Sequence, residues 1–326
     1  MTASGPVVLT LRYDMRAPAF GPPAVELYQA ALEQCAWAEA HGFHAVVVSE
    51  HHGADDGYCP SPVVLASAIA GLTTRVRIMI AALLMPLYDP IRLAEDLAVL
   101  DLVSNGRVDL VVGAGYRPEE LAMYGKTLAD RVPLIEEGLA TLRAAWTGEP
   151  FEYRGRSMRI TPRPARERGP ALLMAGATPA AARRAARLGD GFFPVDASLW
   201  PAYEEACRAL GREPGPAPSL SGPRFVHVAD DPDKAWSLIA PHALHETNAY
   251  GAWLAGAEGV HRYEVVDDAD ALRGSGGYLV LTPDECVELA LETGSLTLHP
   301  LMGGLPPELA WESLDLIASD VLPQLK

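Results

Sequence analysis

A pair of adjacent histidines is the strongest chemical signal in the sequence. His51 and His52 follow Glu50, directly after the apolar run at 45–48. Histidine exchanges a proton near neutral pH, so a histidine beside a bound organic molecule can act as a general acid or base. We expect His51 to be catalytic and His52 to support it, although His51 could instead only hydrogen-bond a neighbouring loop. Glu50 could orient a histidine or pair with an arginine, and we favour the arginine.

Two turns are candidates for binding a cofactor. The first comprises Gly176, Ala177 and Thr178. The second, which follows an apolar run, comprises Gly113, Gly115 and Tyr116. Pro179 suits the first position of a helix and Thr178 its N-cap. Free N–H groups at such a helix start can hold a cofactor phosphate, and the alternative is a capped helix that binds nothing.

The elements that must position these residues alternate between short β-branched runs and helical stretches. Eight runs resemble buried strands, at 7–11, 45–48, 76–84, 108–112, 171–174, 191–195, 225–228 and 296–299. We predict an α/β fold, a (β/α)8 TIM barrel that forms one domain over 1–326, with the site at the carboxyl ends of its strands. An open doubly wound sheet is the alternative, but no glycine-rich dinucleotide motif follows the first strand.

Two stretches exceed a minimal barrel and are predicted as insertion segments. Residues 147–169 are irregular and basic, and residues 230–294 separate strands seven and eight. Loops of this length are lids, substrate walls or disordered connectors. Thr282 before Pro283 and two acids is typical of a helix start, so the second insertion is at least partly structured.

The charge of the chain limits its partners. A formal net charge of −16 repels nucleic-acid phosphates and anionic membranes, so we expect neither as a partner. The longest apolar run, 76–87, contains Arg77 and Pro86 and is too short to span a bilayer. No signal peptide is evident. The four cysteines lack metal-ligand or redox spacing, so we expect free thiols, no metal and a cytoplasmic protein.

Several motifs together resemble those of the luciferase-like flavin-dependent monooxygenases. They are SEHH at 49–52, LMPLYDPIRLAEDLAVLDLVSNGRVDLVVGAGY at 84–116, PFEYRG at 150–155, GDGFF at 189–193 and GLPPELAWESL at 304–314. The combination is specific to the family and spans nearly the whole chain. The resemblance implies that His51 is the catalytic histidine. It also implies that Ala81 and Ala82 form a non-proline cis peptide behind the flavin ring.

The resemblance implies a flavin-dependent oxidoreductase. Our leading hypothesis is a two-component monooxygenase that uses reduced FMN, delivered by a separate flavin reductase, and O2 on a small organic substrate. A deazaflavin-dependent dehydrogenase or reductase is the alternative, and a non-catalytic flavin-binding partner subunit is a third. Ala114 stands where luciferase has a phosphate-contacting arginine, and Arg117 or Arg183 could substitute.

The resemblance also implies a homodimer, packed through the helices after strands two and three. In the second of these helices an apolar stripe is formed by Leu93, Leu97 and Leu100. This stripe could lie in the dimer interface, or it could equally pack inside the barrel.

Overall fold

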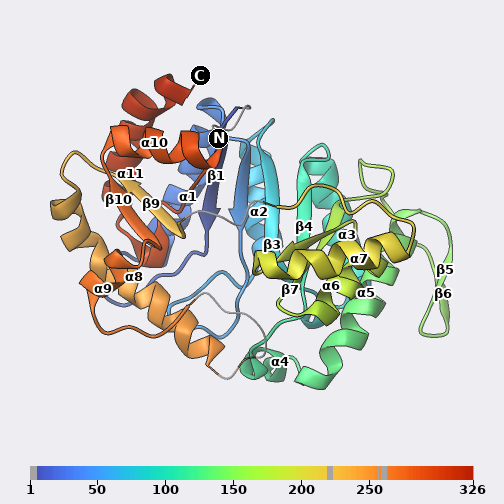
Figure 1. The fold of residues 1–326 in the computed structure, drawn as a ribbon. Coiled ribbons are helices and arrows are strands. Elements are labelled where there is room, and N and C mark those ends of the chain that lie inside the picture. Colours follow the sequence, from blue (N-terminus) through green and yellow to red (C-terminus); the bar gives the residue numbers. More distant parts are fainter. Residues whose placement is uncertain (1–5, 219–222, 256, 258–262, 326) are drawn as a thin grey trace.

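The computed structural model describes residues 6–218, 223–255, 257 and 263–325. A curved parallel sheet with the strand order β11-β1-β2-β3-β4-β7-β8 lies at its centre (Figure 1). The sheet strands are β1 (Val8–Tyr13), β2 (Ala45–Val48), β3 (Arg77–Leu84), β4 (Val108–Gly113), β7 (Ala171–Gly176), β8 (Gly191–Pro194) and β11 (Ser295–Leu298). Val46, Val48, Ile78 and Ile80 are completely buried. Their β-branched side chains suit strands that are covered on both faces.

The described residues do not form the closed, eight-stranded barrel that we predicted. The run predicted as strand seven is β9 (Phe225–Val228), and it pairs in parallel with β10 (Tyr278–Leu281) in a separate two-stranded sheet. Within the described residues, no hydrogen-bonded ladder joins β9 to β8 or to β11. The sheet at the centre therefore has seven strands, and β9 lies beside β11 without pairing with it.

Helices follow most of the strands, and Figure 1 shows them around the central sheet. They are α1 (Ala24–Ala40), α2 (Pro62–Leu72), α3 (Pro90–Val103), α4 (Pro118–Met123), α5 (Arg131–Trp146), α6 (Pro179–Leu188), α7 (Trp200–Ala209), α8 (Pro232–Leu254), α9 (Ala269–Gly274), α10 (Pro283–Thr293) and α11 (Pro307–Leu316). Among the described residues, none of the helices is both long and apolar enough to cross a membrane.

The first insertion contains an antiparallel hairpin of β5 (Phe151–Tyr153) and β6 (Arg156–Met158). Its turn residues Arg154 and Gly155 both have left-handed φ angles, 48° and 74°. This is the geometry of the tight turns that match the twist of a hairpin. Our prediction of an irregular segment was wrong here, because three-residue strands are too short to give a periodic signal.

The second insertion carries α8, α9, β10 and α10. Its side chains Trp236, Ile239 and Tyr278 form a hydrophobic cluster with Phe225 of β9, separate from the main core. This cluster packs α8 against the β9–β10 pair. The pairing of β9 with a strand of the insertion explains why β9 does not close the barrel.

Candidate active site

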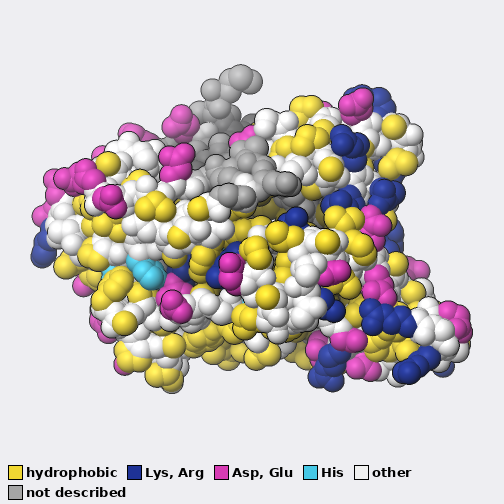
Figure 2. Space-filling model, turned by 90° about the horizontal axis from the view of Figure 1, so that it is seen from below, with side chains coloured by type: hydrophobic (Ala, Val, Ile, Leu, Met, Phe, Trp, Pro, Cys, Tyr) yellow, Lys and Arg dark blue, Asp and Glu magenta, His cyan; other side chains and the backbone are white. Residues whose placement is uncertain are grey.

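The predicted site residues meet at one edge of the central sheet. His51 follows β2, Ala81–Ala82 lies near the end of β3, Gly113–Tyr116 follows β4, and Gly176–Thr178 follows β7. These four strands are consecutive in the sheet, so their carboxyl ends are neighbours. The helix α4, which follows β4, lies at the lower edge of Figure 1. Figure 2 shows the molecule from that lower side, where hydrophobic side chains are spread over the middle of the face.

His51 is held by the carboxylate of Glu120, which lies on α4. Its Nδ1 lies 2.7 Å from Glu120 Oε1, and its Nε2 lies 3.4 Å from the Tyr116 hydroxyl. A carboxylate at Nδ1 requires a proton there, so in the neutral ring Nε2 carries the lone pair. Sequence reasoning missed Glu120, because nothing in its spacing links α4 to β2.

The charges of this pair follow from its surroundings. His51 is only 7% exposed, and burial lowers the pKa of its ring, although Glu120 acts to raise it. Burial favours the protonated form of Glu120, but hydrogen bonds from His51 and the His52 N–H, with the charge of Arg117, lower the pKa of its carboxyl. At neutral pH the site therefore holds a neutral imidazole beside a carboxylate.

Glu50 orients a histidine, so our preference for an arginine partner was wrong. Its carboxylate accepts hydrogen bonds from His52 Nε2 at 2.8 Å, the Tyr88 hydroxyl at 2.8 Å and the Leu84 N–H at 2.7 Å. The pairing of β2 with β3 brings Glu50 to this backbone. The Tyr124 hydroxyl lies 3.0 Å from Nδ1 of His52. His52 is thus tied into the scaffold on both sides, as expected for a supporting residue.

Aromatic rings enclose His51. The centroids of Tyr58, Tyr116, Tyr250 and Trp253 lie 4.8, 5.5, 6.0 and 4.8 Å from that of its ring. The hydroxyls of Tyr58 and Tyr250 are 2.8 Å apart. Tyr250 and Trp253 belong to α8, so the second insertion supplies a wall of the site.

A buried arginine that sequence reasoning missed lies beside this wall. Arg16 is completely buried after β1. It forms an ion pair with Asp56, and its Nε lies 3.4 Å from Asp14 Oδ2. Its guanidinium carbon lies 4.8, 4.7 and 4.5 Å from the ring centroids of Tyr58, Tyr250 and Trp253. Cation–π contacts of this kind are strong where water is excluded.

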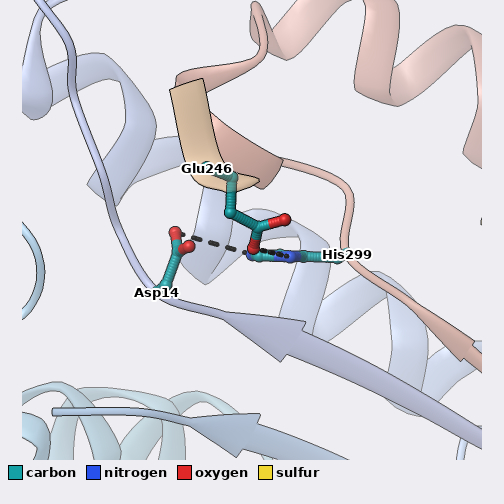
Figure 3. A group of neighbouring side chains, drawn as sticks. All are labelled: Asp14, Glu246 and His299. Carbon is teal, nitrogen blue, oxygen red and sulfur yellow. Dashed lines mark ion pairs between the residues drawn. The ribbon is translucent and has the colours of Figure 1, made fainter. Parts of the chain in front are cut away.

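Three side chains that could ligate a metal lie close together: Asp14, Glu246 and His299 (Figure 3). All three are completely buried. Asp14 Oδ1 lies 3.5 Å from His299 Nε2, whereas Glu246 Oε1 lies 3.5 Å from His299 Nδ1. The carboxylates thus approach different ring nitrogens, which suits a bridge between β1, α8 and β11 better than one shared ion.

The peptide bond between Ala81 and Ala82 is cis, as the resemblance implied. Both residues are partly exposed, and the pairing of β3 with β4 shifts register next to them. A Cβ placed on Gly113 would lie 3.0 Å from the Cβ of Ala82, so only glycine fits there without movement. The structure therefore brings Gly113 and the Ala81–Ala82 bond together.

The predicted phosphate site has the expected local structure. Thr178 is the N-cap of α6, and its hydroxyl accepts a hydrogen bond from the Ala181 N–H at 3.2 Å. Residues Gly176, Ala177 and Thr178 are all partly exposed. The first turn of a helix leaves backbone N–H groups available to an anion.

The arginines suggested as replacements at Ala114 lie elsewhere. Arg117 is buried and donates to the His52 carbonyl and to Glu120. Arg183 is exposed on α6. Arg131, which sequence reasoning missed, donates to the Gly115 carbonyl at 2.9 Å and so fixes that loop.

The fold is shared by known proteins. The chain belongs to the luciferase-like monooxygenase family, whose model matches residues 14–296. It is therefore an enzyme of a family whose members include flavin-dependent monooxygenases and F420-dependent dehydrogenases.

Three curated relatives show this range. An uncharacterised protein of Sinorhizobium fredii is 32% identical over 61% of this chain, a match that spans 57% of that protein. An F420-dependent glucose-6-phosphate dehydrogenase of Segniliparus rotundus is 28% identical over 98% of both chains. The oxygenase component of a flavin-dependent trigonelline monooxygenase of Acinetobacter baylyi is 27% identical over 70% of this chain and 67% of that protein.

Two solved structures share the fold over nearly the whole chain. The monooxygenase RslO1 of Streptomyces bottropensis has a TM-score of 0.78 and 25% identity, covering 98% of this chain and 100% of that one. The oxygenating constituent of 3,6-diketocamphane monooxygenase of Pseudomonas putida, in complex with FMN, has a TM-score of 0.73 and 22% identity, covering 98% of each chain.

Proposed function

We propose that this protein is the oxygenase of a two-component monooxygenase. It would take reduced FMN from a separate flavin reductase and use O2 on a small organic substrate. The His51–Glu120 pair, a buried neutral imidazole with an accepting Nε2 at the same sheet edge as Ala81, Ala82 and Gly113, supports an oxidoreductase. The observation that favours an oxygenase is the likeness to oxygenase relatives.

The residues at this edge fit a flavin. Ala81 and Ala82 have small side chains and are partly exposed, so a flat ring could lie against their backbone. The start of α6, capped by Thr178, offers N–H groups to a phosphate. When bound, reduced FMN supplies the two electrons that activate O2.

The chain's own residues then have two tasks. Nε2 of His51 accepts a proton from the substrate or a reacting oxygen, and the Glu120 carboxylate stabilises the imidazolium that results. The aromatic wall around His51 excludes water, which strengthens this electrostatic interaction and protects reactive species from hydrolysis.

A second candidate function is hydride transfer with a deazaflavin. The 28% identity to an F420-dependent dehydrogenase over 98% of both chains favours it. The same His51–Glu120 pair would accept the hydroxyl proton of an alcohol as the alcohol carbon gives up its hydride. The pair is therefore compatible with either cofactor.

Anaerobic titration of the protein with reduced FMN, and separately with the reduced deazaflavin, distinguishes the two functions. The proposal expects micromolar affinity for reduced FMN, followed by an oxygen-dependent absorbance change that is slower to decay than in free FMN. Preference for the deazaflavin without any oxygen-dependent change would instead establish hydride transfer. Binding of neither would refute both.

We also propose that the protein is a homodimer that packs through α2 and α3. Leu93, Leu97 and Leu100 are buried within the chain, so this stripe is internal packing. Other apolar side chains on these two helices are exposed, namely Val64, Leu72, Val99, Leu102 and Val103. Because α2 and α3 lie side by side, these side chains offer an apolar face to a second copy.

A further inference from the structure

The ring of Trp253 lies against His51, the residue that must reach the substrate. Trp253 lies on the last turn of α8, with its ring centroid 4.8 Å from that of His51. Tyr58 and Tyr250 are buried and joined through their hydroxyls. Trp253 and Tyr116 are partly exposed, and the Tyr116 hydroxyl lies 3.4 Å from Nε2 of His51. A substrate can therefore approach His51 where one of these two rings now lies, and of the two Trp253 also contacts guanidinium groups.

The surroundings of the indole are unusual for a surface tryptophan. Two buried guanidinium groups contact the same ring, with the central carbons of Arg16 and Arg117 at 4.5 and 4.2 Å from its centroid. A guanidinium plane stacks on electron-rich aromatic rings and gains most where it is desolvated. The space that the indole fills, the Trp253 slot, is therefore lined to recognise a flat aromatic ring.

Two buried donors of Arg16, Nε and Nη2, make no hydrogen bond within the described residues. Nε still lies at an ion-pair distance of 3.4 Å from Asp14 Oδ2, and Nη1 is engaged with Asp56. Nη2 is therefore the donor that is left for a ligand. An unpaired buried N–H is costly, so an oxygen acceptor on a ligand would satisfy it.

We propose that the substrate is an oxygenated aromatic molecule, such as a phenol, whose ring replaces the Trp253 indole over Arg16 and Arg117 beside His51. The oxygen substituent on its ring accepts a hydrogen bond from Arg16 Nη2. Each of the two arginines already has a carboxylate partner, Asp56 for Arg16 and Glu120 for Arg117. The slot therefore selects the ring face and its oxygen rather than a large negative charge. This inference rests on the proposed function, of which it names the substrate class.

Binding to the cofactor-free protein tests the proposal without turnover. The probes are 2-naphthol and its saturated counterpart decahydro-2-naphthol, which keeps the hydroxyl and loses the aromatic faces. We expect 2-naphthol to bind about tenfold more tightly, as the loss of cation–π contacts implies. Equal affinities would refute aromatic selection.

The variant Trp253→Ala tests the replacement itself. Removing the indole removes the cost of displacing it, so we expect the affinity for 2-naphthol to rise about tenfold. Trp311→Ala, which removes another partly exposed indole on α11, is the matched control and should leave the affinity unchanged. If Trp253→Ala leaves the affinity unchanged or lowers it, the indole is a fixed wall and the proposal is wrong.

Two further measurements separate substrate from cofactor and test the donor. If excess FMN competes with 2-naphthol, the slot belongs to the flavin and the substrate assignment fails, while the proposed function survives. Simultaneous binding supports the assignment. Arg16→Lys keeps the charge toward Asp56 but loses the planar face and Nη2, so it should weaken 2-naphthol binding about tenfold and leave FMN affinity unchanged.

Discussion

His51 and Glu120 are joined by a 2.7 Å contact between Nδ1 and Oε1, although they lie 69 residues apart in the chain. If this contact fixes the tautomer of His51, Glu120→Gln should lower kcat/KM about a hundredfold without loss of fold. Glu119→Gln is the control, because Glu119 is the exposed neighbour on the same helix. Equal kinetics for the two variants would remove Glu120 from the mechanism.

The pH dependence of activity follows from the same pair. Burial lowers the pKa of His51, and activity requires the neutral ring, so kcat/KM should rise with pH on the acid side and level off by neutral pH. Glu120 acts to raise that pKa. In Glu120→Gln the acid limb should therefore move to lower pH. A shift to higher pH would contradict the assignment of this limb to His51.

Asp14 should make stability depend on pH. Burial opposes its charge, but His299 and Arg16 outweigh this and hold the pKa of its carboxyl well below the ordinary value. A lowered pKa in the folded state stabilises the fold above the unfolded-state pKa of about 3.9, and this contribution is lost as pH falls. Asp14→Asn should cost about 3–5 kcal/mol of unfolding free energy at pH 7.

Urea unfolding at pH 7, 4 and 2.5 measures this cost, which should be nearly constant down to the unfolded-state pKa of about 3.9 and smallest at pH 2.5. Asp55→Asn alters an exposed carboxylate nearby and should stay within about 0.5 kcal/mol of the wild type. A cost for Asp14→Asn that does not change with pH would show that packing, rather than charge, explains it.

Gly113 should tolerate no side chain. Gly113→Ala places a methyl group 3.0 Å from Ala82, which should cost about 1–3 kcal/mol in urea unfolding and weaken flavin binding. Gly71 in α2 has open space around it, so Gly71→Ala should stabilise the protein by about 0.5–1 kcal/mol. Intact flavin affinity in Gly113→Ala would place the ring elsewhere.

Substitution of two N-cap threonines, Thr178 and Thr282, distinguishes an effect on stability from an effect on phosphate binding. Thr178→Ala and Thr282→Ala each remove an N-cap hydrogen bond and should each cost about 1 kcal/mol. Only Thr178→Ala should also weaken the binding of FMN, and riboflavin, which lacks the phosphate, should be affected much less. If both variants bind FMN equally well, the start of α6 does not hold the phosphate.

The proposed dimer depends on an exposed apolar face. Val103→Glu places a charge among the exposed side chains of α3 and should convert a dimer to a monomer in light scattering at micromolar concentration. Val25→Glu, on α1, replaces another exposed valine and should leave the assembly unchanged. A monomeric wild type would end the proposal.

The strands and helices that position the site could be predicted from the sequence because their signals are local. The run predicted at 45–48 matches β2 residue for residue, and the helix start predicted at Thr178 and Pro179 is the start of α6. Their β-branched runs, proline starts and caps carry the information within a few residues. The Thr282 cap of α10 was recognised for the same reason.

The rest depends on contacts between distant segments. Nothing local shows that β9 pairs with β10 instead of closing the sheet, or that α8 brings Trp253 to His51. Glu120 and Arg16 are ordinary surface-type residues in the sequence, and only the fold buries them. The preference for an arginine beside Glu50 failed because a backbone N–H of the neighbouring strand β3 and the ring of His52, two residues further along the chain, supply its donors.

The separate hydrophobic cluster of α8 and the β9–β10 pair has an evolutionary consequence. The proton-transfer pair stands on segments after β2 and β4, whereas Trp253 stands on α8, which also packs on the β9–β10 pair, and its own side chain packs against the main core. Exchange of residues 230–294 between homologues that share these main-core contacts would therefore change which molecules are accepted while the chemistry stays the same. Such chimeras must keep Glu246, because it bonds to Tyr278 and bridges to His299 across the junction.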